Sequence, residues 1–303
     1  MKIVLAGGTG FIGKALRESL TERDHEVVIL TRQVSRENDA GIRTRFRHWN
    51  PPEGGTWEKE LEGAGAVINL SGEPIVGKRW SAVQKKRILE SRTQTARALV
   101  RALEKTRVKP TVFINASAVG YYGERGDETV TEEIRPGNGF LAETCKAWEA
   151  EVLKAEGLGL RVIRLRIGIV LEKGGGALEK MLPPFQFGLG GPLGSGLQWM
   201  SWIHLKDLVG LVHFLVEKKE TRGAFNATAP HPVTMKEFAR TLGRVLRRPA
   251  FFPVPAFVLK ILLGESADLL LTGQRVLPKH ALEAGYRFHF SELEPALKEI
   301  LTR

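Results

Sequence analysis

A glycine-rich turn stands between the first apolar segment of the chain and the first helical pattern. Residues 2–6 (KIVLA) form a short apolar run rich in strand-forming residues, and residues 7–13 read GGTGFIG. Residues 14–20 then have helical spacing, and a second apolar run follows at residues 26–30. The order strand, tight turn, helix, strand predicts a βαβ unit with parallel strands and a right-handed crossover.

The three framework glycines of this turn suit a phosphate-bearing ligand. Gly7 would permit the sharp turn, and Gly10 would let backbone N–H groups approach a pyrophosphate. Gly13 would let the helix pack close to the sheet, with its N-terminus facing the anion. Because the turn lies at the first strand–helix junction of a βαβ unit, it predicts a dinucleotide-binding site.

The strand–helix alternation continues along the first part of the chain. It predicts an α/β fold, a Rossmann doubly wound parallel sheet covered on both faces, with strand order 3-2-1-4-5-6 and a seventh strand. The further strands are expected at residues 44–48, 66–70, 112–116, 160–165 and 224–227, and the long helices at residues 79–107, 140–155 and 204–216.

The alternation weakens after residue 170. Glycine-rich stretches at residues 173–176 and 188–196 surround an amphipathic segment, and the last seventy residues show helical patterns at 234–246, 256–271 and 291–301 without further strand signals. We therefore expect two domains. The dinucleotide-binding Rossmann domain would comprise residues 1–170 and 201–228, and a smaller, mainly helical C-terminal cap would comprise residues 171–200 and 229–303.

Composition limits the classes of protein that fit. The chain has 303 residues, 43% of them hydrophobic and 26% charged, which is typical of a folded globular protein. No apolar run approaches the ~20 residues that cross a bilayer, and no signal peptide is recognisable, so we expect a cytoplasmic protein with no membrane partner. A single cysteine, Cys145, cannot form an internal disulfide, and the histidines lack metal-ligand spacing, so no metal site is expected.

The net charge of +11 favours polyanionic ligands. A phosphorylated cofactor is one such ligand and nucleic acid is another. The basic residues at 78–109 and 240–248 have helical spacing without interleaved aromatic residues, which is typical of a solvated helix face. We therefore expect no specific nucleic-acid partner.

Several motifs together resemble those of the extended short-chain dehydrogenase/reductases. They are the glycine turn, the segment NLSG at residues 69–72, SAVGYYG at 117–123 and WIHLKD at 202–207. With AETCKAWE at 142–149 and the glycine-rich stretch at 174–196, the chain is more narrowly similar to an atypical branch of that family, the epimerase family proteins related to nucleoside-diphosphate-sugar epimerases. The resemblance covers essentially the whole chain and implies fold and cofactor, whereas it leaves the substrate open.

The end of the second strand indicates which nicotinamide cofactor to expect. A carboxylate at this point would accept hydrogen bonds from the ribose 2′-OH of NAD, but residues 30–33 read LTRQ. Arg32 offers a fixed fork of cationic donors that suits the 2′-phosphate of NADP. Together with positions implied by the resemblance, the expected NADP-binding residues are Gly7, Thr9, Gly10, Phe11, Ile12, Gly13, Thr31, Arg32, Leu70, Ser71, Arg87, Arg92, Lys146 and Val170.

The usual catalytic hydroxyls are missing from the positions that the resemblance assigns to them. Relatives use a Tyr-x-x-x-Lys pair, in which lysine lowers the tyrosine pKa. Here Lys146 is kept, but Ala142 stands four residues earlier, and the partner serine position is Ala118, with Ser117 beside it. We expect Lys146 to orient the nicotinamide ribose.

Two functions stay open. Tyr121 or Tyr122, which follow the fifth strand, could supply the phenol from another position, so that Tyr121, Tyr122 and Lys146 are the candidate catalytic residues of an oxidoreductase or epimerase acting on a small polar substrate such as a nucleotide sugar. Alternatively, the protein binds NADP(H) without turnover as a sensor or regulator. The sequence is compatible with either a monomer or a homodimer. We expect His204 and Asp207 to be structural.

Overall fold

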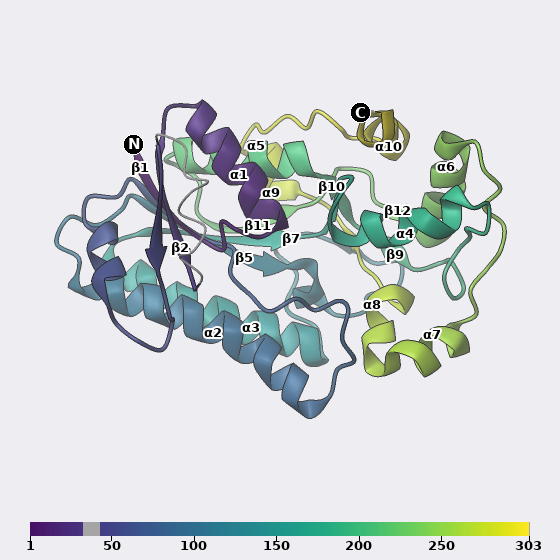
Figure 1. The fold of residues 1–303 in the computed structure, drawn as a ribbon, viewed down its shortest axis with the longest axis horizontal. Coiled ribbons are helices and arrows are strands. Elements are labelled where there is room, and N and C mark those ends of the chain that lie inside the picture. The colour runs from purple at the N-terminus through teal and green to yellow at the C-terminus, as the bar shows by residue number, and fades with distance from the viewer. Residues whose placement is uncertain (33–42, 303) are drawn as a thin grey trace.

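The computed structural model describes residues 1–32 and 43–302, and a seven-stranded parallel sheet forms its centre (Figure 1). The strands lie in the order β3-β2-β1-β4-β5-β7-β11. This confirms the expected doubly wound order with its seventh strand. The strands are β1 (Lys2–Ala6), β2 (Glu26–Thr31), β3 (Thr44–His48), β4 (Ala66–Asn69), β5 (Val112–Ala118), β7 (Arg161–Ile167) and β11 (Gly223–Ala227).

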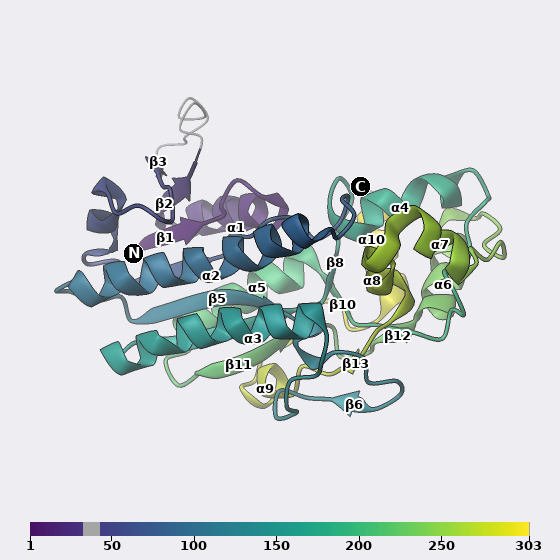
Figure 2. The same cartoon turned by 90° about the horizontal axis from the view of Figure 1, so that it is seen from below.

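Helices cover both faces of the sheet, as Figures 1 and 2 show. On one face lie α1 (Phe11–Glu22) and α5 (Leu205–Glu217), and on the other lie α2 (Ala82–Lys105) and α3 (Phe140–Leu153). The central strands are apolar throughout because both faces of the sheet are buried. Strand β1 is an example, since its alternate side chains enter two different cores. Ile3 and Leu5 pack on the side of α1 and α5, and Val4 and Ala6 pack on the side of α2 and α3.

The cap has its own apolar core at one end of the molecule (Figure 2). It joins α4 (Gly176–Gln186), α6 (Met235–Leu246) and α10 (Leu293–Thr302), together with a short antiparallel pair, β9 (Trp199–Met200) and β12 (Val233–Thr234). A parallel pair of short strands, β8 (Ile169–Leu171) and β10 (Trp202–His204), links this cap to the sheet.

Two expectations for the last seventy residues were wrong. Residues 256–271 are not one helix, because α7 (Ala256–Leu263) ends at Gly264, whose φ of +62° lies in the left-handed region, and α8 (Asp268–Leu271) follows a 3₁₀ turn. This region also contains strands. Besides β12 there is β13 (Arg275–Val276), paired with β6 (Thr129–Val130), and strands of two residues are too short to give an alternating pattern.

The C-terminal segment returns to the Rossmann half before it enters the cap. Helix α9 (Lys279–Glu283) packs on β11, and Ala281 and Tyr286 belong to the core between the sheet and α5. The Tyr286 hydroxyl donates to the Asp207 carbonyl oxygen over 2.9 Å. The division into the two expected domains stays a prediction. Within the segment expected to belong to the cap, α9 and Tyr286 pack on the Rossmann half.

Candidate functional site

The glycine turn forms the tight backbone crossing that its sequence predicts. Gly7 has φ +83°, and a Cβ there would lie 2.8 Å from the backbone carbonyl carbon of Leu70. A Cβ on Gly13 would lie 2.2 Å from the Gly7 carbonyl oxygen. Gly10 caps α1 and donates its N–H to that same oxygen over 3.1 Å. The turn thus holds the N-terminus of α1 against the ends of β1 and β4, where an anion is favoured.

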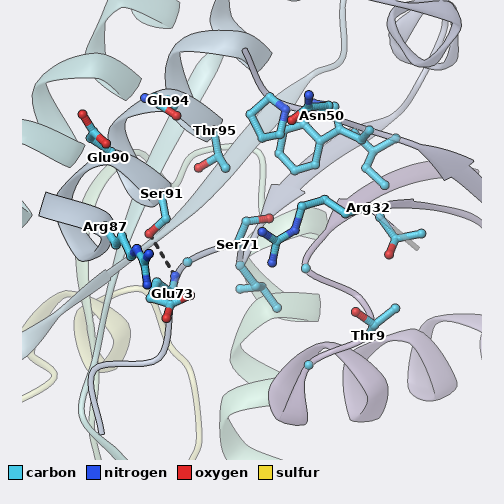
Figure 3. A pocket seen from close by; sticks show the side chains of 18 of the residues that line it. Thr9, Arg32, Asn50, Ser71, Glu73, Arg87, Glu90, Ser91, Gln94 and Thr95 are labelled. Atoms are coloured by element: carbon cyan, nitrogen blue, oxygen red, sulfur yellow. Dashed lines mark hydrogen bonds between the residues drawn. The ribbon is translucent and has the colours of Figure 1, made fainter. Parts of the chain in front are cut away.

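A cleft of about 790 Å³ opens at this edge of the sheet (Figure 3). It lies at the carboxyl ends of β1, β2 and β4 and is closed on one side by α2. This is the place where open α/β sheets bind ligands, and the volume lies within the ~300–1,000 Å³ of typical small-molecule sites. Of the expected cofactor-binding residues, the cleft is lined by Gly7, Thr9, Gly10, Thr31, Arg32, Leu70, Ser71 and Arg87.

Other expected cofactor residues do not line this cleft: Phe11, Ile12, Gly13, Arg92, Lys146 and Val170. Arg92 donates to the carbonyl oxygens of Glu73 and Ile88 and lies over the Trp148 ring, 5.3 Å from its centroid. Burial lowers the pKa of Arg92. Arg92 therefore supports the turn after β4 from behind, and its expected contact with the cofactor phosphates stays a prediction.

Phe11 and Val170 lie on the far side of the glycine turn, beside a glycine-rich loop. A Cβ on Gly175 would lie 2.2 Å from the Phe11 ring, and one on Gly176 would lie 3.1 Å from the Val170 carbonyl oxygen. The loop at residues 173–176, which joins β8 to α4, therefore packs directly against the turn at the start of α1. This close approach places a cap segment next to the expected dinucleotide site.

The cleft contains cations that can meet phosphate groups. In Figure 3, Arg32 reaches across from the end of β2 toward Ser71, and Arg87 comes from α2. Neither arginine forms an ion pair with a described residue. The cleft also contains Glu90 and Glu73. The pKa of Glu73 is lowered first by a hydrogen bond from Lys78, then by one from Gln84 and by the charge of Arg32. The cleft thus stays rich in positive charge where β2 ends without a carboxylate.

Sequence analysis missed a second group of lining residues. After β3 come Trp49 to Pro52, and α2 contributes Glu90, Ser91, Gln94 and Thr95. Trp49 is buried, and its Nε1 has no hydrogen-bond partner among the described residues. An aromatic residue at the carboxyl end of a parallel strand was the signal that could have identified this wall, since the ends of neighbouring strands meet at one edge.

The region expected to carry chemistry lies farther along the sheet, at the ends of β5 and β7. Ala142 is buried in the first turn of α3, and Ala118 is the last residue of β5. Ser117 is also buried, and its hydroxyl donates to Glu149 Oε1 over 2.7 Å. Neither alanine side chain has a proton to exchange, and the Ser117 hydroxyl is already hydrogen-bonded to the Glu149 carboxylate.

The two tyrosines after β5 have different surroundings. Tyr122 is fully buried, donates to Asn226 Oδ1 over 2.6 Å and accepts from Arg166 over 2.9 Å. Burial raises its pKa to about 12, although the Arg166 charge opposes this. Tyr121 is half-buried, and the Arg166 guanidinium lies 3.5 Å from its ring centroid. Tyr122 is thus fixed in a buried network, whereas Tyr121 stands at its margin.

Arg166 is the centre of that buried network. Its Nε and Nη2 each donate to one oxygen of Glu149, both over 2.9 Å. Burial disfavours the charge of Arg166, but these hydrogen bonds and the Glu149 charge raise its pKa above the usual range. Because Glu149 belongs to α3, the pair fixes that helix against the ends of β5 and β7.

Lys146 lies on α3 one turn after Ala142. Its ammonium is partly exposed and contacts both oxygens of Glu143, at 3.0 and 3.1 Å. The structure does not bring Lys146 into contact with either candidate tyrosine through any described hydrogen bond. The catalytic roles of Lys146, Tyr121 and Tyr122 stay predictions.

The WIHLKD segment makes the structural connections that we expected of it. His204 Nδ1 accepts the Lys206 N–H over 3.0 Å, and its Nε2 lies 2.9 Å from Glu299 of α10. The Asp207 carboxylate accepts the N–H groups of His289 and Phe290. These bonds hold the C-terminal segment to the start of α5. Among residues 1–32 and 43–302, no group of three potential metal ligands is brought together.

Comparison with known proteins decides the family. The model of the NAD-dependent epimerase/dehydratase family matches residues 3–228, and a domain of unknown function, DUF1731, matches residues 254–300. The chain belongs to the NAD-dependent epimerase/dehydratase family. The resemblance drawn from the motifs is therefore confirmed, and the family match ends at residue 228, close to the end of β11.

Whole-length members of the family resemble the chain closely. It is 42% identical to the epimerase family protein SDR39U1 homolog, chloroplastic, of Arabidopsis thaliana, over 99% of this chain and 87% of the relative. It is also 42% identical to the epimerase family protein YfhF of Bacillus subtilis, over 99% and 98%. A crystal structure of human epimerase family protein SDR39U1 with NADPH superposes with a TM-score of 0.88 at 35% identity, covering 100% and 99% of the two chains.

The same comparison leaves location and assembly open. One relative is named chloroplastic, so the expected cytoplasmic location stays a prediction. Among the helices of the described chain, none combines the length and apolar character that a bilayer crossing requires. The choice between monomer and homodimer also stays open.

Proposed function

We propose that the protein binds NADP(H) in the cleft at the ends of β1, β2 and β4 and acts as an oxidoreductase or epimerase on a small polar substrate such as a nucleotide sugar. The observation that carries the choice of cofactor is Arg32, which projects into the cleft at the end of β2, where NAD-binding proteins place a carboxylate. The NADPH in the crystal structure of the human relative supports the same choice.

The described residues fit this cofactor chemically. Gly7 and Gly10 leave the backbone open to a pyrophosphate beside the N-terminus of α1. Arg32 and Arg87 would meet phosphate groups, and Ser71 would meet the adenosine ribose. The buried Trp49 Nε1 is a donor without a partner in the described chain, and a nitrogen or oxygen acceptor of a ligand in the cleft would satisfy it.

For catalysis, the protein must supply the proton that its two alanines cannot. When bound, the nicotinamide would supply or accept a hydride. We assign the accompanying proton to the Tyr121 hydroxyl, because Tyr122 is buried and hydrogen-bonded on both sides whereas Tyr121 is half-exposed. The Arg166 guanidinium, 3.5 Å from the centroid of the Tyr121 ring, would hold that ring in place. Lys146 would orient the ribose.

Paired titrations test the choice of cofactor. We expect the protein to bind NADPH at least about tenfold more tightly than NADH, since charged hydrogen bonds to a phosphate contribute ~1.5–3 kcal/mol. Arg32→Ala should remove that preference, and Arg101→Ala, an exposed arginine elsewhere on the protein, should leave it intact. Equal affinities for the two cofactors in the unaltered protein would refute the assignment.

A second candidate is a sensor that binds NADP(H) without turnover, and the absence of hydroxyls at Ala118 and Ala142 favours it. The two functions differ in the absorbance of the reduced nicotinamide during a screen of carbonyl compounds and sugar nucleotides. An enzyme gives a sustained change with at least one substrate. A sensor gives none, and instead binds a partner protein with an affinity that depends on whether NADP⁺ or NADPH is bound.

A further inference from the structure

Large apolar side chains are exposed to solvent at the tip of the cap. Helix α7 is apolar at every position except Lys260, yet only Leu259 is buried. Phe257 and Ile261, one turn apart, are 64% and 67% exposed. The exposed large apolar side chains of this end of the molecule include Phe187, Leu189, Phe251, Phe252, Phe257, Ile261 and Leu262.

These side chains come from segments that lie side by side. The Phe252 N–H donates to the Gly190 carbonyl oxygen over 3.2 Å, and the Gly194 N–H donates to the Val254 carbonyl oxygen over 2.9 Å. The Phe251 and Phe252 rings are 4.5 Å apart, and α7 begins four residues later. We call residues 187–190 and 247–263 the cap tip. Figure 2 places α7 at the end of the molecule opposite β3.

Charge at the cap tip has one sign. The sequence from residue 245 to residue 264 contains no aspartate or glutamate, and neither does the sequence from 181 to 206. Arg247, Arg248 and Lys260 are exposed, and none of the three forms an ion pair with a described residue. The surface is therefore both apolar and cationic, which is the composition of segments that lie in the headgroup region of an anionic bilayer.

The cap tip is held in place without help from a partner. Arg79, just before α2, donates from its Nε to the Leu262 carbonyl oxygen over 3.0 Å, and it also bonds the Ile261 carbonyl. Lys85 of α2 forms an ion pair with Glu265, directly after α7. These bonds satisfy the C-terminal end of α7 and fix the helix to the Rossmann half, so that its exposed face is presented as a rigid surface.

We propose that the cap tip docks on the surface of an anionic lipid bilayer, with the aromatic and aliphatic side chains entering the headgroup layer. A second copy of the chain is a poorer occupant, because a two-fold contact would bring the same three cations together without an acid in either segment. The proposal concerns docking at a surface, so it agrees with the lack of a membrane-crossing helix in the described chain. It differs from our expectation that the protein has no membrane partner, and the experiment below decides between the two.

Co-sedimentation of the full chain with vesicles tests the docking. We expect binding to vesicles of phosphatidylcholine mixed with phosphatidylglycerol, weaker binding at high salt, and little binding to phosphatidylcholine alone. The double variant Phe257→Ser, Ile261→Ser should lower the partition coefficient at least about tenfold, since two large side chains no longer enter the bilayer. The variant Arg247→Ser, Arg248→Ser should also lower it, by about tenfold.

Matched control variants distinguish binding through the cap tip from nonspecific binding of the protein to vesicles. Val108 and Leu282 are 62% and 48% exposed elsewhere on the molecule, and Val108→Ser, Leu282→Ser should bind vesicles like the unaltered chain. Lys218→Ser, Lys219→Ser removes two exposed cations after α5 and should leave binding nearly unchanged. Phe257→Trp should show a blue shift of the added fluorescence with anionic vesicles, which reports insertion even if the serine variant does not fold.

Three outcomes would overturn the proposal. One is that the unaltered chain does not sediment with anionic vesicles. A second is that the cap-tip variants and the controls lose binding equally. The third is that light scattering shows a dimer which the Phe257→Ser, Ile261→Ser variant abolishes and which anionic vesicles do not dissociate. In that case a second copy of the chain covers the surface. None of these results depends on NADPH binding, so the docking and the proposed function fail separately.

Discussion

The carboxyl edge of the sheet divides into two regions with opposite properties. At β1, β2 and β4 it is an open cleft lined by glycine backbone and by Arg32 and Arg87, neither of which forms an ion pair with a described residue. At β5, β7 and β11 it is closed by a buried network in which Arg166, Glu149 and Tyr122 satisfy one another. The same fold thus leaves polar groups available at one end and uses them internally at the other.

The difference teaches that binding and chemistry are separable in this fold. In the proposed cofactor site of the first region, backbone N–H groups and one helix terminus would do much of the binding, so that few side chains are needed. The second depends on particular hydroxyls, and Ala142 and Ala118 have none. Cofactor binding is therefore expected to be robust, whereas turnover depends on whether Tyr121 can act from the margin of the network.

The largest effect should follow removal of the Tyr121 hydroxyl. If the closed region still carries chemistry, Tyr121→Phe should slow single-turnover reduction about 10²–10⁴-fold, the usual contribution of a positioned acid, with NADPH affinity unchanged. Tyr122→Phe is the matched control, and it should change the rate only a few-fold. Equal rates in Tyr121→Phe and the unaltered protein would remove Tyr121 from the mechanism.

Tyr122→Phe should instead affect folding. Its pKa in the folded protein is raised from 10.0 to about 12, so the folded state is favoured below pH 10 and this contribution is lost as the pH rises through 12. Alkaline unfolding followed by circular dichroism should therefore begin at a lower pH in the unaltered protein than in Tyr122→Phe, after correction for their difference in stability at neutral pH. The same midpoint shift in Tyr121→Phe would contradict this assignment.

The next largest effect is expected from breaking the buried ion pair between Arg166 and Glu149. Arg166→Met leaves the Glu149 carboxylate buried, with Ser117 and Arg164 as its remaining hydrogen-bond donors among the described residues, and should lower the free energy of unfolding by about 3–5 kcal/mol. Urea unfolding measures this loss. Arg97→Met, which removes a partly exposed pair with Glu151, should cost no more than about 1 kcal/mol. Similar losses in both variants would mean that the two pairs contribute alike.

A methyl group at the glycine turn should have a smaller effect on stability. Gly13→Ala places a Cβ within 2.2 Å of the Gly7 carbonyl oxygen, so α1 must shift, and we expect a loss of about 1–3 kcal/mol together with weaker NADPH binding. Gly157→Ala has open space around its Cβ and should be neutral or stabilising. Full NADPH affinity in Gly13→Ala would show that the cleft tolerates movement of α1.

Lys146→Ala should have the smallest effect. The Lys146 ammonium is partly exposed and already paired with Glu143, so its loss should weaken NADPH binding only a few-fold and change the single-turnover rate less. Isothermal titration with NADPH and rapid-mixing kinetics would measure both quantities. A larger effect on the rate than on affinity would instead place Lys146 in the chemical step.

Much of the fold could be predicted because its signals are local. The alternation of apolar strand segments with helical patterns was enough to predict the sheet order. The glycine turn and Arg32 at the end of β2 were enough to predict the cofactor. The wall formed by Trp49 and the residues of α2 could not be predicted. Its members are distant in the sequence and have ordinary helical or loop patterns, and only the crossover of the chain brings them to one cleft.

The sequence by itself determined where backbone must approach backbone and where hydroxyls are missing, because Gly7, Gly13 and Ala142 act through the atoms they lack. The tertiary structure alone decided what the remaining polar groups do. Whether Tyr122 titrates or stays neutral depends on its burial and on Arg166, which stands 44 residues away in the chain. Burial and partner geometry are properties of the assembled fold, and no local pattern encodes them.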